Sequence, residues 1–532
     1  MSAEPLTLEQ LPGDALLAVM QYLCVDDLFA CRLVCKRLCG LALDRDVWCR
    51  REVDSLKLRR TQSLAGLLRL APCVGTMVVR LGEGGALPYA TTTCPADRLI
   101  LKCYGLGADI SLFTQVVRNQ EALGRLRTVV VEYVEPPYVE IVNEAVDVLL
   151  RTLVQSSSLE SLEFANGWPI SLHPFVCKSQ SSSLKKFRCE LLGSSEWLVN
   201  AVLGGHAATL EDVDIGVLYF RHWAGFVRGM SSCTTTVRLL VSLPRLRRLR
   251  CAALPGLEDL VASEVLTDLT LLVYDDDSHE QVVSLLQRAN QLRRLSLVDV
   301  TATTDVDRKS VGAQAVEALA SSGRSRLESL SLIDDLPSSR PLLLALPRLA
   351  ALRELTVCDE PVDSELLQGI SPVTAPTLRR LEVHWAYKDC AHAWLHSDAM
   401  GFLARNPMVH LQLQNPRLCG GVDGRGLCDD SDDDIFCDEC DGDDDCSQCD
   451  GYDDRGGQCV PCARRCHPEL LRVVRTELWA LDKIRFLEYG SGNKGLCGLG
   501  LFGHDIGRCP SPQDHIISPS QWRWIHVPPV SN

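Results

Sequence analysis

The chain has 532 residues and a formal net charge of −15. This length exceeds that of an ordinary single domain and predicts several folding units or one long repeat array. Neither a long uncharged apolar run nor a basic segment followed by an apolar one is present. We therefore expect no membrane span, no secretory signal and a cytoplasmic or nuclear location. The acidic balance argues against a nucleic-acid partner.

Charge and cysteine are unevenly distributed along the chain. Fourteen of the 25 cysteines precede Asn415 and eleven follow it. In a reducing compartment these are expected to be free thiols or metal ligands rather than disulfides. Residues 423–455 hold 15 acidic residues and two arginines, a net charge of 2 − 15 = −13. The remainder carries about −2 by subtraction, so the rest of the chain is nearly neutral.

Residues 11–48 carry apolar side chains at helical spacing. The pattern predicts three short helices, with Asp14 capping the first and Asp26 the second. A bundle of this size buries little surface and would be stabilised by docking on a partner. The alternative is an ordinary amphipathic helical start to a repeat array.

This stretch closely resembles an F-box. The shared features are Leu-Pro at its start, the Leu-Leu and Tyr-Leu pairs, Asp-Leu, Val-Cys-Lys and a closing Trp. Leu38 departs from the pattern, because many members have Trp there. The resemblance implies that residues 5–52 bind the Skp-type adaptor of a cullin-based (SCF) ubiquitin ligase. The residues implied in adaptor binding are Leu11, Pro12, Leu16, Leu17, Leu23, Leu28, Val34, Cys35, Lys36 and Trp48.

Residues 51–70 read as a helical connection, and 77–81 and 99–102 as strands. A repeated unit, L-x-x-L-x-L with conservative substitutions, follows eleven times. Five of its ten intervals are 25 or 26 residues, within the range of leucine-rich repeats. The units begin at Leu126, Leu159, Leu184, Leu210, Leu246, Leu266, Leu292, Leu327, Leu352, Leu378 and Met408.

Each unit predicts a short parallel strand whose fourth and sixth residues point inward. Helical patterns lie between the units, beginning at Asn143, Ser195, His279 and Gly312. Stacking such units buries a continuous core, which predicts an α/β solenoid over residues 53–416. The alternative is a generic α/β domain with coincidental leucine triplets.

An F-box followed by such repeats resembles the F-box/leucine-rich-repeat proteins. The resemblance implies a horseshoe whose outward strand positions, the third and fifth of each unit, bind a substrate. We predict substrate contacts at Lys186, Arg188, Arg248, Arg250, Arg294, Glu354, Arg380 and His410. Their basic members could hold an acidic or phosphorylated segment. For any one residue, a solvated strand face is the competing interpretation.

Residues 417–467 form an acidic, cysteine-rich segment. Its Cys-x-x-Cys pairs and closing Cys-His fit two interleaved tetrahedral zinc sites with eight ligands. The predicted ligands are Cys437, Cys440, Cys446, Cys449, Cys459, Cys462, Cys466 and His467. A disordered acidic loop with free thiols and calcium bound by the aspartates are the alternatives.

Residues 468–532 are predicted to form a C-terminal helix and a capping tail. The stretch from His467 to Gly490 predicts the amphipathic helix. Trp522, Trp524 and Ile525 are expected to cap the repeat array. No nucleophile–base pattern or phosphate loop stands out, and His206 is expected to be structural. The family resemblance implies a non-catalytic substrate receptor of a ubiquitin ligase. The alternatives are a ligase-independent repeat scaffold and a zinc module that selects the partner.

Overall fold

The computed structural model describes residues 11–57, 63–81, 87–104, 110–133, 144–165, 182–191, 195–216, 233–274, 278–299, 310–333, 339–358 and 364–384. It also describes residues 402, 405–406, 409–414, 486–489 and 524–527. The chain divides into two compact units, Met1–Gln281 and Val282–Asn532. None of the described helices is long and apolar enough to traverse a bilayer.

The first unit begins with four helices, the last of which is a single turn. They are α1 (Gly13–Tyr22), α2 (Val25–Val34), α3 (Lys36–Ala42) and α4 (Arg45–Trp48). The predicted caps are wrong. Pro12 precedes α1, and the thiol of Cys24, not Asp26, accepts the backbone N–H at the start of α2. Both aspartates lie at the second residue of their helix, in the first turn, where a carboxylate still interacts favourably with the helix dipole.

A parallel sheet follows the helices. Strands β1 to β9 pair in chain order, each parallel to the next. They span Glu52–Asp54, Val74–Leu81, Ala96–Cys103, Thr128–Tyr133, Ser161–Ala165, Lys186–Arg188, Asp212–Asp214, Arg248–Ala252 and Asp268–Val273. Among the described residues of the predicted connection at 51–70, the α-helix is α5 (Leu64–Leu70). Strand β1 and a 3-10 turn, η2 (Ser55–Lys57), precede it.

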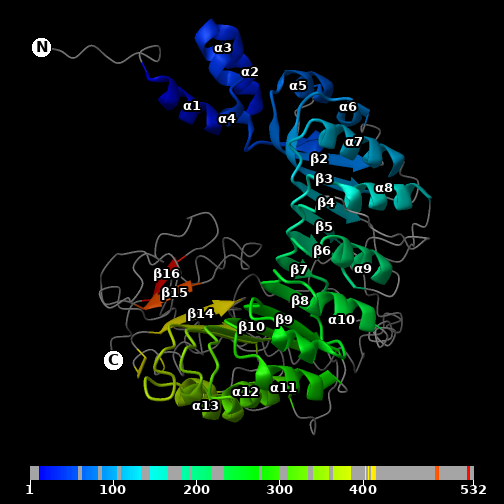
Figure 1. Cartoon of the computed structure of the whole chain (residues 1–532). Helices are drawn as coiled ribbons and strands as arrows, with labels where there is room; N and C mark the ends of the chain where they lie inside the picture. The colour runs from blue at the N-terminus through cyan, green and yellow to red at the C-terminus, as the bar shows by residue number, and fades with distance from the viewer. Residues whose placement is uncertain are drawn as a thin grey trace, which may run out of the picture. The chain divides into compact units, whose positions relative to one another are not determined.

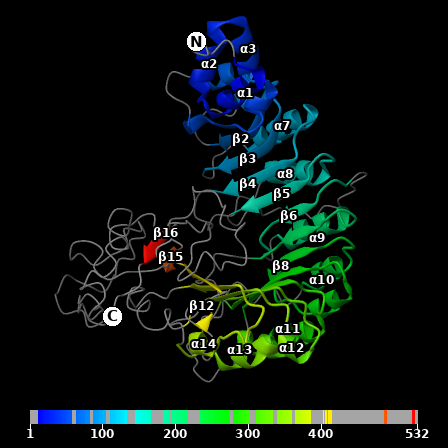
Figure 2. The same ribbon diagram turned by 90° about the vertical axis from the view of Figure 1, so that its left-hand side faces the viewer.

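Helices line one side of these strands (Figure 2). They are α6 (Leu87–Ala90), α7 (Ile110–Ala122), α8 (Glu144–Gln155), α9 (Glu196–Gly205) and α10 (Thr234–Val241), with a 3-10 turn η4 (Leu257–Ala262). In α8, Val146, Leu149, Leu150 and Leu153 are buried, as their 3.6-residue spacing requires. The core therefore lies between the strands and these helices.

The second unit repeats the plan (Figure 1). Strands β10 (Arg294–Asp299), β11 (Ser329–Ile333), β12 (Glu354–Cys358), β13 (Arg380–His384) and β14 (His410–Gln414) pair in parallel in chain order. Between them lie α12 (Val311–Ser321), α13 (Arg340–Ala345), η6 (Leu346–Arg348) and α14 (Ser364–Gly369). Helix α11 (His279–Arg288) spans the division between the two units.

The repeat prediction is confirmed at strand level. Every strand from β4 to β14 begins at the third position of its L-x-x-L-x-L unit. The fourth and sixth positions point inward, as at Leu162 and Phe164, which are each 1% exposed. The observed architecture is a mixed α/β fold with consecutive parallel strands.

Near the C-terminus, β15 (Phe486–Tyr489) pairs in parallel with β16 (Trp524–Val527). The end of the helix predicted from His467 is therefore wrong, because residues 486–489 form a strand. Trp524 and Ile525 belong to β16; their predicted role as a cap stays a prediction. The cysteine-rich segment lies outside the described residues.

Candidate protein-interaction surfaces

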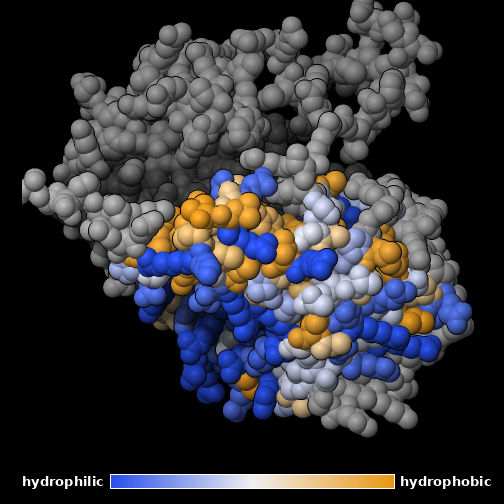
Figure 3. Space-filling view, turned by 90° about the horizontal axis from the view of Figure 1, so that it is seen from above, coloured by the Kyte–Doolittle hydropathy of each residue, from blue (hydrophilic) through white to orange (hydrophobic). Residues whose placement is uncertain are grey.

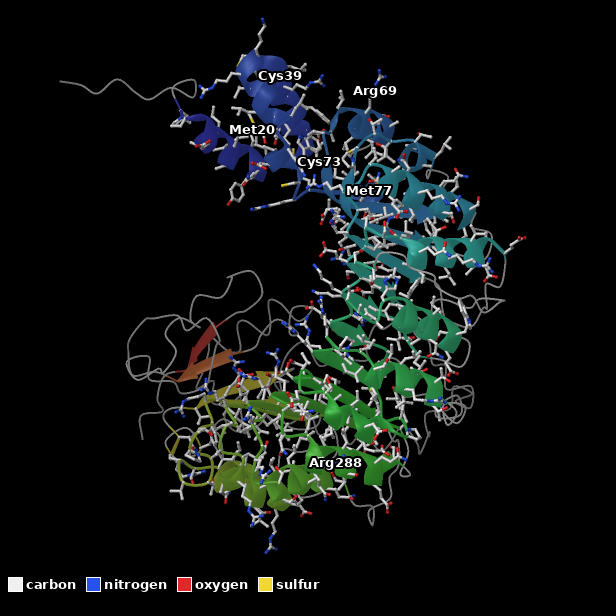
Figure 4. All side chains as sticks on the ribbon, viewed as in Figure 1. Met20, Cys39, Arg69, Cys73, Met77 and Arg288 are labelled. Carbon is white, nitrogen blue, oxygen red and sulfur yellow. The ribbon has the colours of Figure 1, made fainter. Side chains whose placement is uncertain are left out.

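The helical bundle is held by a core centred on Trp48. This side chain is fully buried, and its indole Nε1 donates to the carbonyl of Ala42 at 2.8 Å. The ring lies 5.9 Å from that of Phe29, and the guanidinium of Arg51 stands 5.8 Å from its centroid. Arg51 also donates to the carbonyl of Met20 at 2.8 Å, which joins α1 to the chain segment leading into β1. Figure 4 shows this region, with Met20 labelled.

The predicted adaptor-binding residues separate into two groups. Leu16, Leu28 and Trp48 are buried in the core of the bundle, so they act by shaping it. The exposed members are Pro12, Val34, Cys35 and Lys36, while Leu11, Leu17 and Leu23 are half-buried. In this conformation only the exposed and half-buried members can touch another protein.

Two adjacent apolar residues at the end of α2 stand out. Leu33 is 85% exposed and Val34 69%. At 100° per residue, Leu33 lies about 140° around the helix from the buried Leu28, so it faces away from the core. Leu33 is not among the residues predicted from the sequence to bind the adaptor, although its position on the helix could have indicated its exposure. Covering a side chain of this size stabilises a contact by about 1.5–3 kcal/mol.

We call Leu33, Val34, Cys35 and Lys36 the α2–α3 patch. Cys35 is the N-cap of α3, and its sulfur accepts from the backbone N–H of Leu38 at 3.4 Å. Figure 3 looks down on the N-terminal end of the chain and shows hydrophobic side chains gathered beside strongly hydrophilic ones. An apolar pair next to a lysine offers both hydrophobic area and a charge to a partner.

The second candidate surface is the outward strand face of β5–β8. Ser161, Lys186, Asp212 and Arg248 stand in register across these strands. The fifth-position residues Glu163, Arg188, Asp214 and Arg250 stand in a second row, two residues further along. The alternation of sequence positions therefore places both predicted columns on one face.

The second row forms a continuous series of ion pairs. Arg188 lies 2.9 Å from Glu163 and 3.3 Å from Asp214, and Arg250 reaches Asp214 at 3.8 Å. Burial raises the pKa of Asp214 from its ordinary value, and the neighbouring Arg250 opposes that rise. These arginines are therefore partly neutralised within the face.

In the first row, the positive charge of Arg248 is neutralised in the same way, because its Nη2 lies 2.7 Å from Asp212. Lys186, also exposed, has no ion pair among the described residues. In the second unit, Arg380 lies 3.0 Å from Glu354. Arg294 begins β10, and the side chain of His410 lies outside the described residues. An acidic segment that binds at Arg188, Arg248, Arg250 or Arg380 would have to displace an existing carboxylate partner. Substrate binding by the predicted residues stays a prediction.

His206 is buried and bridges two segments. Its Nε2 donates to the carbonyl of Val154 at 3.0 Å, and its Nδ1 lies 2.9 Å from the hydroxyl of Ser182. Burial lowers the pKa of His206, while the bond to Val154 opposes this shift. The residue is thus a neutral structural histidine, as expected.

The cysteines whose side chains are described, from Cys24 to Cys251, are free thiols. Burial raises the pKa of Cys94 to about 12 and that of Cys233 to about 11, so these thiols are protonated at neutral pH. Among the described residues no group of three or more side chains could hold a metal ion. The eight predicted zinc ligands lie in the cysteine-rich segment, outside those residues, and stay a prediction.

Comparisons with known proteins bear on the N-terminal region. The F-box-like family model matches residues 8–53. No curated protein matches the chain. A solved structure entitled "Crystal structure of TLR13-ssRNA13 complex" aligns with 66% of this chain at 13% identity and a TM-score of 0.32. The alignment spans 50% of the length of that structure's chain. The N-terminal region of this chain is F-box-like.

Proposed function

We propose that this protein is a non-catalytic substrate receptor of an SCF-type ubiquitin ligase. The observation that carries the proposal is the F-box-like match over residues 8–53 together with the exposed α2–α3 patch. The patch would bind a Skp-type adaptor and, through it, a cullin. We place the protein in the cytoplasm or nucleus, where such ligases act.

The parallel-strand region would serve as a leucine-rich-repeat array that holds the substrate. Its outward strand positions carry ordered charged side chains on a rigid sheet, which suits specific recognition. Once the substrate is held on the same complex as the ubiquitin-carrying enzyme, its effective concentration rises by orders of magnitude. The chain itself then needs no catalytic group.

The test is a pull-down of the full chain from cell lysate, with the adaptor and cullin scored by mass spectrometry. The variants are Leu33→Glu and Val34→Glu, each of which places a carboxylate in the patch. The matched control is Val373→Glu in the second unit, because that valine is also exposed, at 85%. Loss of 1.5–3 kcal/mol corresponds to roughly ten- to hundredfold weaker binding.

We expect adaptor and cullin to co-purify with the wild type and the control but not with the patch variants. If neither co-purifies with the wild type, the receptor proposal fails. Retention of other partners in that case would favour the alternative function, a repeat scaffold that acts without a ligase. The ordered strand face is the observation that supports the alternative.

A further inference from the structure

The edge of the second unit where strands β11–β13 begin is rich in arginine. At the second position of successive repeats stand Arg293, Glu328, Arg353 and Arg379. Their backbones are joined laterally, by Glu328 N to Arg293 O at 2.7 Å, Arg353 N to Glu328 O at 2.8 Å and Arg379 N to Arg353 O at 2.7 Å. Neighbouring strands lie about 4.8 Å apart, so these side chains emerge side by side.

The arginines of this edge exceed its acidic residues. Glu328 is already paired with Arg293 at 3.0 Å. We define the arginine edge as the remaining cations there: Arg324, Arg326, Arg348, Arg353 and Arg379. The first four are exposed, and none of the five forms an ion pair with any described residue. The edge therefore presents several uncompensated charges over three neighbouring repeats.

At the same edge of β4–β6 in the first unit, the cations share a carboxylate partner. There Glu160 lies 2.8 Å from Lys185 and 3.7 Å from Arg127. The hydrogen bond from Lys185, the largest cause, lowers the pKa of the Glu160 carboxyl. Compensation of this kind is absent at Arg324, Arg326, Arg348, Arg353 and Arg379 among the described residues. An excess of like charge that the fold does not neutralise is suited to an anionic ligand.

We propose that the arginine edge binds a carboxylate-rich peptide segment of a protein partner. All five cations are arginine, whose planar guanidinium matches a carboxylate in a two-bond arrangement. Three neighbouring strands are about 10–14 Å across and an extended peptide advances about 3.3 Å per residue, so about three to five acidic residues would span three repeats. This proposal does not depend on the ligase function, because it concerns a surface of the second unit alone.

A peptide is favoured over a single-stranded nucleic acid. Nucleic-acid grooves combine cations with aromatic side chains on which bases stack. The described residues between 310 and 384 include no Phe, Tyr or Trp. The net charge of −15 would also repel a polyanion as a whole, whereas a short acidic segment meets only the local field.

The test measures fluorescence anisotropy of a labelled oligoglutamate peptide with the full chain, at low and at physiological salt. The edge variant is Arg326→Glu/Arg353→Glu. The matched control is Arg69→Glu/Arg118→Glu, which makes the same charge change at exposed arginines of α5 and α7 in the first unit. Figure 4 labels Arg69. We expect the edge variant to bind at least about tenfold more weakly, and the control to bind like the wild type.

Three outcomes would overturn the proposal. If the edge variant and the control bind the peptide equally well, the arginine edge is not the binding site. Tighter binding of an oligothymidine probe than of oligoglutamate would assign the edge to nucleic acid. Absence of binding by the intact chain would also overturn it. Should binding then appear when the aspartates of residues 423–455 are replaced by asparagine, the occupant is the chain's own acidic segment rather than a partner.

Discussion

Substitution of Trp48 and substitution of Val34 should each abolish partner binding by the F-box-like region, but for different reasons. Both were predicted from the sequence to bind the adaptor, but Trp48 is fully buried and Val34 is 69% exposed. Trp48→Ala should therefore abolish binding by unfolding the bundle. Val34→Glu should abolish binding while the bundle stays folded, because it changes only the surface.

The two substitutions differ in the expected change in the free energy of unfolding. Truncation of a buried Trp costs about 3–5 kcal/mol. Trp48 also loses its hydrogen bond to Ala42, which leaves that carbonyl without this donor. An exposed substitution such as Val34→Glu changes stability by about 0.5 kcal/mol or less. Since 1.4 kcal/mol is a factor of ten, amide exchange in α1–α4 should accelerate by between about 10²- and 10⁴-fold in Trp48→Ala.

The assay is hydrogen exchange by mass spectrometry on peptides from residues 11–51 of the full chain, with adaptor pull-down in parallel. Peptides from β10–β13 provide the internal reference. If Trp48→Ala leaves exchange in α1–α4 unchanged yet loses the adaptor, Trp48 contacts the partner directly and the assignment to the core is wrong. If Val34→Glu accelerates exchange as strongly as Trp48→Ala, the patch is part of the core.

Three further predictions concern other parts of the chain. Asp54 pairs with Arg80 at 2.8 Å, with side-chain exposures of 3% and 12%, so Asp54→Asn should lower the free energy of unfolding by about 3 kcal/mol in urea titrations. The pKa of His206 is lowered, so the unfolded chain binds the proton first; stability is full above pH 6.5 and falls as the pH drops below it. His206→Gln should flatten that pH dependence in thermal unfolding. For the cysteine-rich segment, elemental analysis should find two zinc ions per chain, and fewer in Cys437→Ser and Cys446→Ser.

The L-x-x-L-x-L spacing alone determined where the strands begin. Alternate residues of a strand point to opposite faces, so only two arrangements are possible, and the strand adopts the one that buries its leucines. Strands β4 and β13, in different units, both follow this rule. The sequence also placed Trp48 and Leu28 at positions that resemble an F-box. It could not show whether such residues touch a partner or the core, because a buried apolar residue and a contact residue have the same composition and spacing.

Only the tertiary structure decided which charged side chains remain available to bind a partner. The sequence presents Arg188, Arg248 and Arg353 as equivalent basic residues at repeat positions. Lateral pairing of strands brings Asp212 to Arg248 and Glu163 to Arg188, which are 36 and 25 residues apart in the chain. Arg353 meets no such partner among the described residues. The strand register fixes these pairings through interactions between distant residues, so the available charges could only be read from the folded chain.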